Sequence, residues 1–299
     1  MGNIRRFGLT TWNIGFSQCS PQDVVNDHSV GKIQWLKHSY RDRFFADPFI
    51  LCASDSEIRV LVEELEFNTN KGRITELTVD AKTKKLLCRK PLLELDSHLS
   101  YPAIIYNADK ILVCPENSEG ETFSCYEYNE SYRTLSFISE IVRGPLVDST
   151  IYKFENHYYL FATKVPLTQQ DAYLYQSENL FGPYEERCCV SAGKGHSRPA
   201  GNLFRIGEVN YRPTQNCVER YGAAIEIMKI ENFKEYRETY VFSLMPNSFK
   251  YNLGLHTINF AEGLCVVDGK GYLYPMAGRI YNFVRKIYYS FKKYFKNEK

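Results

Sequence analysis

Two aspartates stand at matching places in the sequence, each where a β-branched and aromatic run begins. Asp47 precedes Pro48, and Asp148 precedes Ser149. A carboxylate pair of this type can act as a base and an acid, supply a nucleophile, or hold the hydroxyls of a ligand. The alternative is structural, because an aspartate at a turn often accepts backbone N–H groups. Their repetition along the chain favours a shared site.

Further charged residues follow these positions at similar distances. Glu116 comes after Pro115 at the end of an apolar strand, where a carboxylate needs a partner. Arg198 and Arg212 can either pair with such carboxylates or hold a phosphate through charge-assisted hydrogen bonds. A network of structural ion pairs explains the same residues equally well. The other members of this second group are Glu63 or Glu64, Gln215 and Asp268.

His256 is a candidate general base, metal ligand or hydrogen-bonded structural residue, and a lone histidine is most often structural. The sequence requires no cofactor and assigns no metal ligands, although a divalent metal is compatible with the carboxylates. The chain contains no HExxH segment, nucleophile elbow, Rossmann fingerprint or P-loop. These absences weaken the protease, nucleotidase and dehydrogenase interpretations.

The segments that begin with these residues repeat along the chain. Their opening pairs are separated by 55, 46, 51 and 57 residues, counted between Asp47, Pro102, Asp148, Pro199 and His256. Such a period fits one four-stranded propeller blade. We therefore predict an all-β, five-bladed β-propeller, in which the five openings converge at one end of a central channel.

The two ends of the chain complete this prediction. Residues 7–16 alternate as a strand should, and we expect them to close the last blade and remove its free edge. Residues 17–42 are polar and irregular, which predicts a loop, and little helical periodicity appears before residue 275. The predicted propeller spans residues 1–275, and residues 276–299 form a basic amphipathic helical tail.

The tail and the body carry opposite charge. Formal net charge is +2, and residues 279–299 contain seven Lys or Arg and one Glu, which leaves about −4 for the rest. The body is therefore not a nucleic-acid surface. A basic amphipathic helix is typical of segments that lie on anionic membranes, although it can also dock on the propeller.

Cysteine usage and targeting signals bear on location. Nine cysteines occur without paired spacing, which favours reduced thiols in the cytoplasm over secreted disulfides. No secretory signal and no apolar run of eighteen residues is evident. We expect a cytoplasmic protein that is peripheral on the inner face of the membrane.

Several motifs in order resemble the propeller domain at the N-terminus of glucosamine inositolphosphorylceramide transferases, and similar domains occur in bacterial surface-polysaccharide synthesis. The motifs are Phe45-Ala46-Asp47-Pro48-Phe49, Leu99-Ser100-Tyr101-Pro102, Pro115-Glu116, Val147-Asp148-Ser149-Thr150, Leu180-Phe181-Gly182-Pro183, Arg198-Pro199-Ala200-Gly201, Arg212-Pro213 with Gln215, Tyr221-Gly222 and Leu255-His256-Thr257. That domain is in turn similar to the five-bladed furanosidase propellers of glycoside hydrolase family 43 and the invertases.

This resemblance implies a sugar site. Asp47 matches the base or nucleophile of the hydrolases, but the second blade has Tyr101 at its opening and the third has Asp148 where the hydrolases use glutamate. The hydrolase triad is therefore not intact. The implied catalytic residues are Asp47, Asp148 and Glu116, and the implied substrate-binding residues are Tyr101, Ser149, Arg198, Asn202, Arg212, Gln215, Tyr221 and His256.

The resulting hypothesis is a glycosyltransferase of bacterial surface polysaccharide or lipopolysaccharide biosynthesis. Asp47 or Asp148 would activate an acceptor hydroxyl, and Glu116 would orient the sugar. Arg198 and Arg212 would neutralise the phosphate of an activated donor. The acceptor would be a glycan or a lipid-linked sugar, and residues 279–299 would bind the anionic membrane. The alternatives are a furanosidase-like hydrolase and a non-catalytic glycan-binding propeller.

Overall fold

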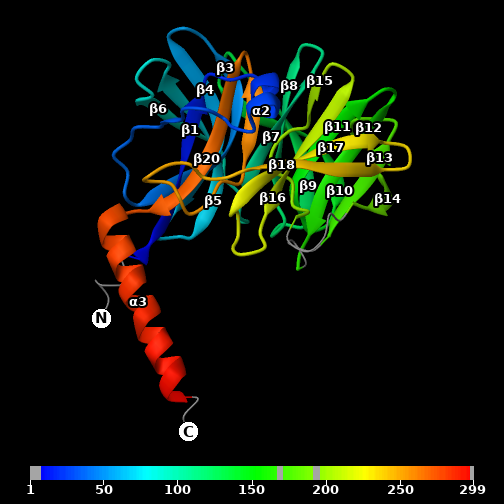
Figure 1. Cartoon of the computed structure of the whole chain (residues 1–299). Coiled ribbons are helices and arrows are strands. Elements are labelled where there is room, and N and C mark those ends of the chain that lie inside the picture. The colour runs from blue at the N-terminus through cyan, green and yellow to red at the C-terminus, as the bar shows by residue number, and fades with distance from the viewer. Residues whose placement is uncertain (1–7, 167–170, 191–195, 297–299) are drawn as a thin grey trace.

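The computed structural model describes residues 8–166, 171–190 and 196–296. Twenty strands form five four-stranded antiparallel sheets. Figure 1 shows the sheets packed side by side in one body. The predicted five-bladed β-propeller is confirmed.

Four blades are built from consecutive strands. Blade one contains β3 (Arg43–Ala53), β4 (Glu57–Glu66), β5 (Lys71–Asp80) and β6 (Leu86–Leu93). Blade two contains β7 (Ser100–Asn107), β8 (Lys110–Glu116), β9 (Thr122–Asn129) and β10 (Thr134–Arg143). Blade three contains β11 (Leu146–Phe154), β12 (His157–Lys164), β13 (Ala172–Ser177) and β14 (Glu185–Cys189). Blade four contains β15 (Phe204–Ile206), β16 (Val209–Asn216), β17 (Ala224–Asn232) and β18 (Arg237–Leu244).

Blade five joins the two ends of the sequence. Its strands are β19 (Ile258–Ala261), β20 (Leu264–Tyr272), β1 (Thr10–Ser17) and β2 (Gln34–Trp35). Strand β1 pairs with β20 along its full length, from Thr10 opposite Tyr272 to Ser17 opposite Cys265. The N-terminal strand therefore closes the last blade, as the sequence predicted.

The loop predicted for residues 17–42 is wrong in two places. Helix α2 (Pro21–Asp27) begins after Ser20, whose side chain and backbone exchange hydrogen bonds with Asp23 in a capping box. Strand β2 adds the fourth strand of blade five. One short helix and a two-residue strand are too brief to produce a periodic pattern, and this is why the sequence pattern did not predict them.

The hydrophobic core lies between the blades. Five clusters of buried apolar side chains each join two neighbouring blades. One of them packs Ile14 and Phe16 of blade five against Val60 and Leu77 of blade one. Because the clusters follow one another around the ring, each blade is held on both faces.

The predicted C-terminal helix is present as α3 (Pro275–Lys296), which extends away from the propeller in Figure 1. Its first turns contact the body, where Arg279 donates a hydrogen bond to the carbonyl of Phe249. Five apolar side chains of the helix are exposed, namely Met276, Ile280, Phe283, Val284 and Ile287. No helix among the described residues is long and apolar enough to cross a membrane.

Candidate functional site

Three of the five innermost strands, β3, β7 and β11, share a local distortion. Asp47, Tyr101 and Asp148 adopt left-handed backbone conformations, with φ of 49°, 43° and 49°. Each lies at a β-bulge, because the pairing register shifts at these places. The predicted openings therefore lie within the strands and not at the turns before them. Such conformations are costly for residues other than glycine and often mark functional sites.

The bulges leave backbone N–H groups without a partner in the neighbouring strand. Carboxylate side chains of other strands accept hydrogen bonds from these N–H groups. The Asp268 carboxylate accepts from the N–H of Asp47 at 3.1 Å, and Asp47 accepts from the N–H of Tyr101 at 3.2 Å. Glu116 accepts from the N–H of Asp148 at 3.0 Å. The predicted structural role of these carboxylates is therefore present, and it links neighbouring blades.

Asp47, His256 and Asp268 form a buried group. His256 Nδ1 lies 2.5 Å from Asp268 Oδ2 and 3.9 Å from Asp47 Oδ1. Burial raises the pKa of Asp47 to about 7, although the nearby His256 opposes this shift. Burial lowers the pKa of His256, but Asp268 and Asp47 outweigh it, so the net shift is upward. At neutral pH such a group can accept or release a proton.

Asp148 is the centre of a second buried group. Its Oδ2 accepts hydrogen bonds from Arg198 Nε and, at 2.8 Å, from Gln215 Nε2. Burial raises the pKa of Asp148 to about 6, which Arg198 opposes and Glu116 reinforces. The Arg198 guanidinium also lies over the ring of Tyr221, 5.0 Å from its centroid. Arg198 is therefore already paired with a carboxylate.

Tyr101 crosses between the blades. Its hydroxyl lies 2.9 Å from Thr150 Oγ1 of blade three and accepts a 2.6 Å hydrogen bond from the N–H of Gly201, at the start of blade four. The side chain is fully buried. Tyr101 therefore ties three blades together near the axis, and its buried hydroxyl already has two hydrogen-bond partners.

Three predicted binding residues, Arg212, Asn202 and Ser149, do not belong to either buried group. Arg212 is fully buried and makes a bidentate ion pair with Glu238, with N–O distances of 2.9 and 2.7 Å. Asn202 donates to the carbonyl of Ile104 and links blades. The Ser149 hydroxyl is buried without a hydrogen-bond partner. For Arg212 the structural ion pair replaces the predicted phosphate contact.

Other residues join the site without having been predicted there. Trp12 stacks on His256, with ring centroids 3.9 Å apart, and His98 Nε2 lies 3.1 Å from Glu63 Oε1. Asp268 had been noted only as one of the charged residues that follow the openings. Trp12 and His98 belong to no repeat motif, so the sequence pattern gave no sign of them.

The donor set of Asp47, His256 and Asp268 is compatible with a divalent cation. One ligand atom from each lies within 4.8 Å of the others, and all three residues are buried. Two carboxylates and an imidazole are common metal ligands. However, Asp47 Oδ1 already accepts a 2.7 Å hydrogen bond from Thr257, and His256 is bonded to Asp268. A cation would have to replace these bonds, and metal dependence stays a prediction.

The fold and these two groups define a five-bladed propeller with a carboxylate-rich cluster between its inner strands. The family described as glucosamine inositolphosphorylceramide transferase 1, N-terminal, matches residues 17–255. The chain belongs to this family, as the sequence motifs indicated.

Two curated relatives carry the name glucosamine inositolphosphorylceramide transferase 1. The rice protein (Oryza sativa subsp. japonica) is 26% identical over 216 residues, which are 67% of this chain and 28% of the relative. The Arabidopsis thaliana protein is 28% identical over 249 residues, or 76% of this chain and 32% of the relative. The chain thus spans less than a third of the length of these relatives.

Solved structures share the fold at low sequence identity. An exo-β-1,3-galactanase from Clostridium thermocellum superposes with a TM-score of 0.54 and 12% identity, covering 72% of this chain and 53% of its own. A family 62 α-L-arabinofuranosidase from Coprinopsis cinerea gives 0.55 and 10%, covering 75% and 78%. These similarities support the propeller architecture.

Proposed function

We propose that this protein takes part in sugar transfer from an activated, phosphate-containing donor to a glycan or lipid-linked acceptor during bacterial surface polysaccharide biosynthesis. The observation that carries the proposal is the convergence of Asp47, His256 and Asp268 with Asp148 and Arg198 between the inner strands. It is supported by membership of a family named for a transferase.

Asp47 is the proposed proton acceptor. Its raised pKa suits a group that must take a proton from a sugar hydroxyl near neutral pH. His256 and Asp268 hold it in place and share the negative charge. Asp148 and Glu116 are the proposed sugar-orienting carboxylates. Helix α3 would bind the propeller to the cytoplasmic face of an anionic membrane.

The test is a transfer assay on the full chain. Nucleotide sugars would be supplied with bacterial lipid extract, and release of the nucleotide and labelling of the lipid would be followed. Asp47→Asn should reduce turnover by about a hundredfold or more, because it removes the base. Asp55→Asn, at an exposed turn of the same blade, is the matched control and should keep full activity.

A second candidate is a glycan-binding propeller without chemistry. It is favoured by one observation: the carboxylates of Asp47, Glu116 and Asp268 already accept backbone N–H groups. This candidate predicts saturable sugar binding that survives Asp47→Asn and no turnover with any donor. Release of sugar in the absence of an activated donor would instead support the hydrolase alternative.

A further inference from the structure

A second place in the molecule gathers cations that have no carboxylate partner. A pocket of about 400 Å³ lies beside β1, between the segment around residues 35–41 and the segment 250–251. Four basic side chains line it, those of Lys37, His38, Arg41 and Lys250, and no acidic residue does. The neighbouring Asp42 is bound to Arg43, at 2.5 Å. Within the part of the chain that the structure describes, Arg41 and Lys250 form no ion pair.

The electrostatics of His38 report the same excess of positive charge. Burial, followed by Lys250 and Arg41, lowers the pKa of His38 to about 4, so its ring is neutral at physiological pH. Its Nδ1 is buried and has no hydrogen-bond partner. An unsatisfied nitrogen between two cations is a position that a ligand with anionic oxygens or hydroxyls would satisfy.

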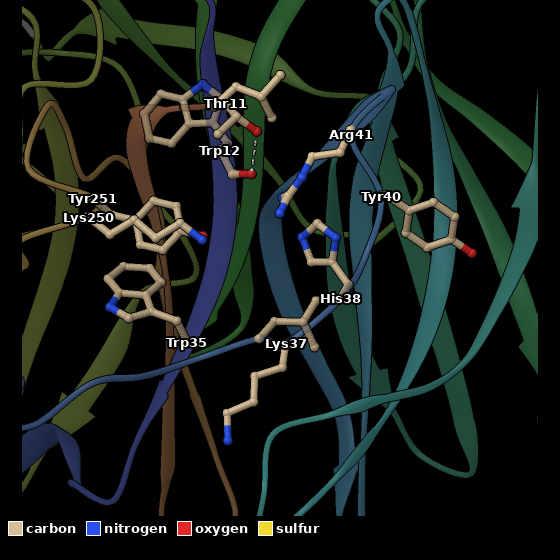
Figure 2. A pocket seen from close by; sticks show the side chains of 11 residues that line it. Thr11, Trp12, Trp35, Lys37, His38, Tyr40, Arg41, Lys250 and Tyr251 are labelled. Carbon is tan, nitrogen blue, oxygen red and sulfur yellow. Dashed lines mark hydrogen bonds between the residues drawn. The ribbon is translucent and has the colours of Figure 1, made fainter. Parts of the chain in front are cut away.

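Aromatic rings form much of the remaining wall, together with Thr11, Leu36 and Leu273. Figure 2 shows Trp12, Tyr251 and Trp35 along one side of the pocket and His38 and Arg41 on the other, while Lys37 extends away. The rings of Trp35 and Tyr251 are 4.4 Å apart, and Lys250 lies over Tyr251. Flat aromatic surfaces beside polar groups bind the apolar faces of sugar rings.

The pocket adjoins both the carboxylate site and helix α3. Trp12 lines the pocket and also stacks on His256. Leu273 lines the pocket two residues before α3 begins, and Arg279 of the helix contacts Phe249, next to Lys250. A ligand held here would therefore lie between the proposed membrane helix and the carboxylates.

We propose that this pocket binds a phosphate group joined to a sugar or cyclitol ring, with Arg41 and Lys250 on the phosphate and the tryptophans against the ring. The inference rests on the proposed function in that a sugar-transfer protein must recognise the phosphate of a donor or of a lipid headgroup. The pocket offers cations without acidic partners for this contact, whereas Arg198 and Arg212 are paired with Asp148 and Glu238.

The chain provides its own reporter. It contains two tryptophans, and both line this pocket. Titration of the full chain with glucose 1-phosphate should quench tryptophan emission in a saturable way, whereas glucose should not. Arg41→Gln and Lys250→Gln should each weaken binding about tenfold, because each removes one charge-assisted contact. Both residues are exposed, and the melting temperatures of the two variant proteins show whether the fold is kept. Arg205→Gln, in a hairpin of blade four, is the matched control.

Vesicles separate the two sources of phosphate. Phosphatidylcholine vesicles containing phosphatidylinositol would be compared with vesicles containing the same share of phosphatidylserine, which matches the charge without the ring. A response to glucose 1-phosphate indicates a soluble ligand, and a response to phosphatidylinositol vesicles alone indicates a headgroup; either supports the pocket.

Three results would overturn the inference: no emission change with any probe, unchanged affinity in both variants, or equal affinity for inorganic phosphate and glucose 1-phosphate. The readout needs no turnover. Ligand binding in the pocket without sugar transfer would count against the proposed function alone. Sugar transfer without a change in tryptophan emission would count against the pocket alone.

Discussion

At the scale of single residues, the carboxylates near the axis combine structural and chemical properties. Asp47 holds the Tyr101 bulge with one oxygen and accepts from Thr257 with the other. Burial raises its pKa and that of Asp148. These shifts have a consequence for stability, since a pKa that differs between the folded and unfolded chain couples folding to pH.

The folded protein should lose stability as pH rises from about 5 to 8. Folding raises the pKa values of Asp47, Asp148 and His256. It lowers the pKa of His38 to about 4, which opposes them, but three groups outnumber one, so the folded chain binds more protons than the unfolded chain over this range. The stability is present below the unfolded pKa values and is lost as pH passes the folded ones. Thermal melts at several pH values would show this as a falling melting temperature.

Asp47→Asn should flatten that dependence, because it removes one titrating group and, beside Asp268, one of the charges that raise the pKa of His256. Asp55→Asn should not change it. Below about pH 4 the opposite trend sets in: the pKa of Glu64 is lowered to about 2 by three arginines and Thr75, so its contribution disappears on acidification. A wild-type melting temperature that rises between pH 5 and 8 would contradict the raised carboxyl pKa values.

The buried pair of Arg212 and Glu238 gives a second prediction at this scale. Arg212→Met should lower the free energy of unfolding by about 3–5 kcal/mol, because it leaves the Glu238 carboxylate buried and unpaired. Adding Glu238→Leu should restore most of the loss. Urea unfolding would measure both. If Arg212→Met unfolds normally but abolishes binding of a phosphorylated ligand, the structural assignment is wrong.

At the scale of elements, the described part of α3 leaves its apolar face without a packing partner. The exposed side chains of Ile280, Phe283 and Ile287 recur at three- and four-residue spacing. Such a face next to basic residues is stabilised at the headgroup boundary of an anionic bilayer. The helix, not the propeller surface, should therefore carry membrane binding.

Phe283→Glu combined with Ile287→Glu should reduce binding to phosphatidylglycerol-containing vesicles by about tenfold or more, since it places two carboxylates where apolar contact is needed. Cosedimentation would measure binding, and added salt should weaken it in the wild type. Tyr132→Glu, at an exposed aromatic position on blade two, is the control. Equal binding by the double variant would remove α3 as the membrane contact.

At the scale of the whole molecule, closure makes the five blades depend on one another. Strand β1 completes blade five, and its Ile14 packs against blade one. No blade buries its apolar faces alone, so loss of one interface exposes the next. Unfolding should therefore be cooperative across the ring although the chain is long.

Ile14→Ala should destabilise the whole propeller by about 2–5 kcal/mol. Emission of Trp12 and Trp35 reports on blade five, and far-ultraviolet circular dichroism reports on all blades. The two denaturation curves should coincide in the variant, as they should for Ile227→Ala in blade four, which is equally buried. An earlier transition in tryptophan emission would mean that blade five opens alone.

The sequence by itself determined the architecture and the composition of the tail. Repeated strand openings predict blades, and three- and four-residue spacing predicts α3, because both patterns are local and periodic. The sequence pattern did not predict the short α2 and β2, because a segment of a few residues is too short to show a periodic pattern. The motifs also placed Asp47, Asp148 and His256 in one region, since each follows the same point of the repeat.

Only the tertiary structure decided which charges are already paired. Arg212 meets Glu238 and Arg198 meets Asp148 across 26 and 50 residues of sequence, and the cations Arg41 and Lys250, which have no acidic partner, line one pocket with Trp12. These contacts depend on strand register and on the way neighbouring blades face each other, which no local pattern records. For that reason the sequence pointed to Arg198 and Arg212 as phosphate ligands, whereas the fold pairs both of them and leaves Arg41 and Lys250, which no motif had singled out, without an acidic partner.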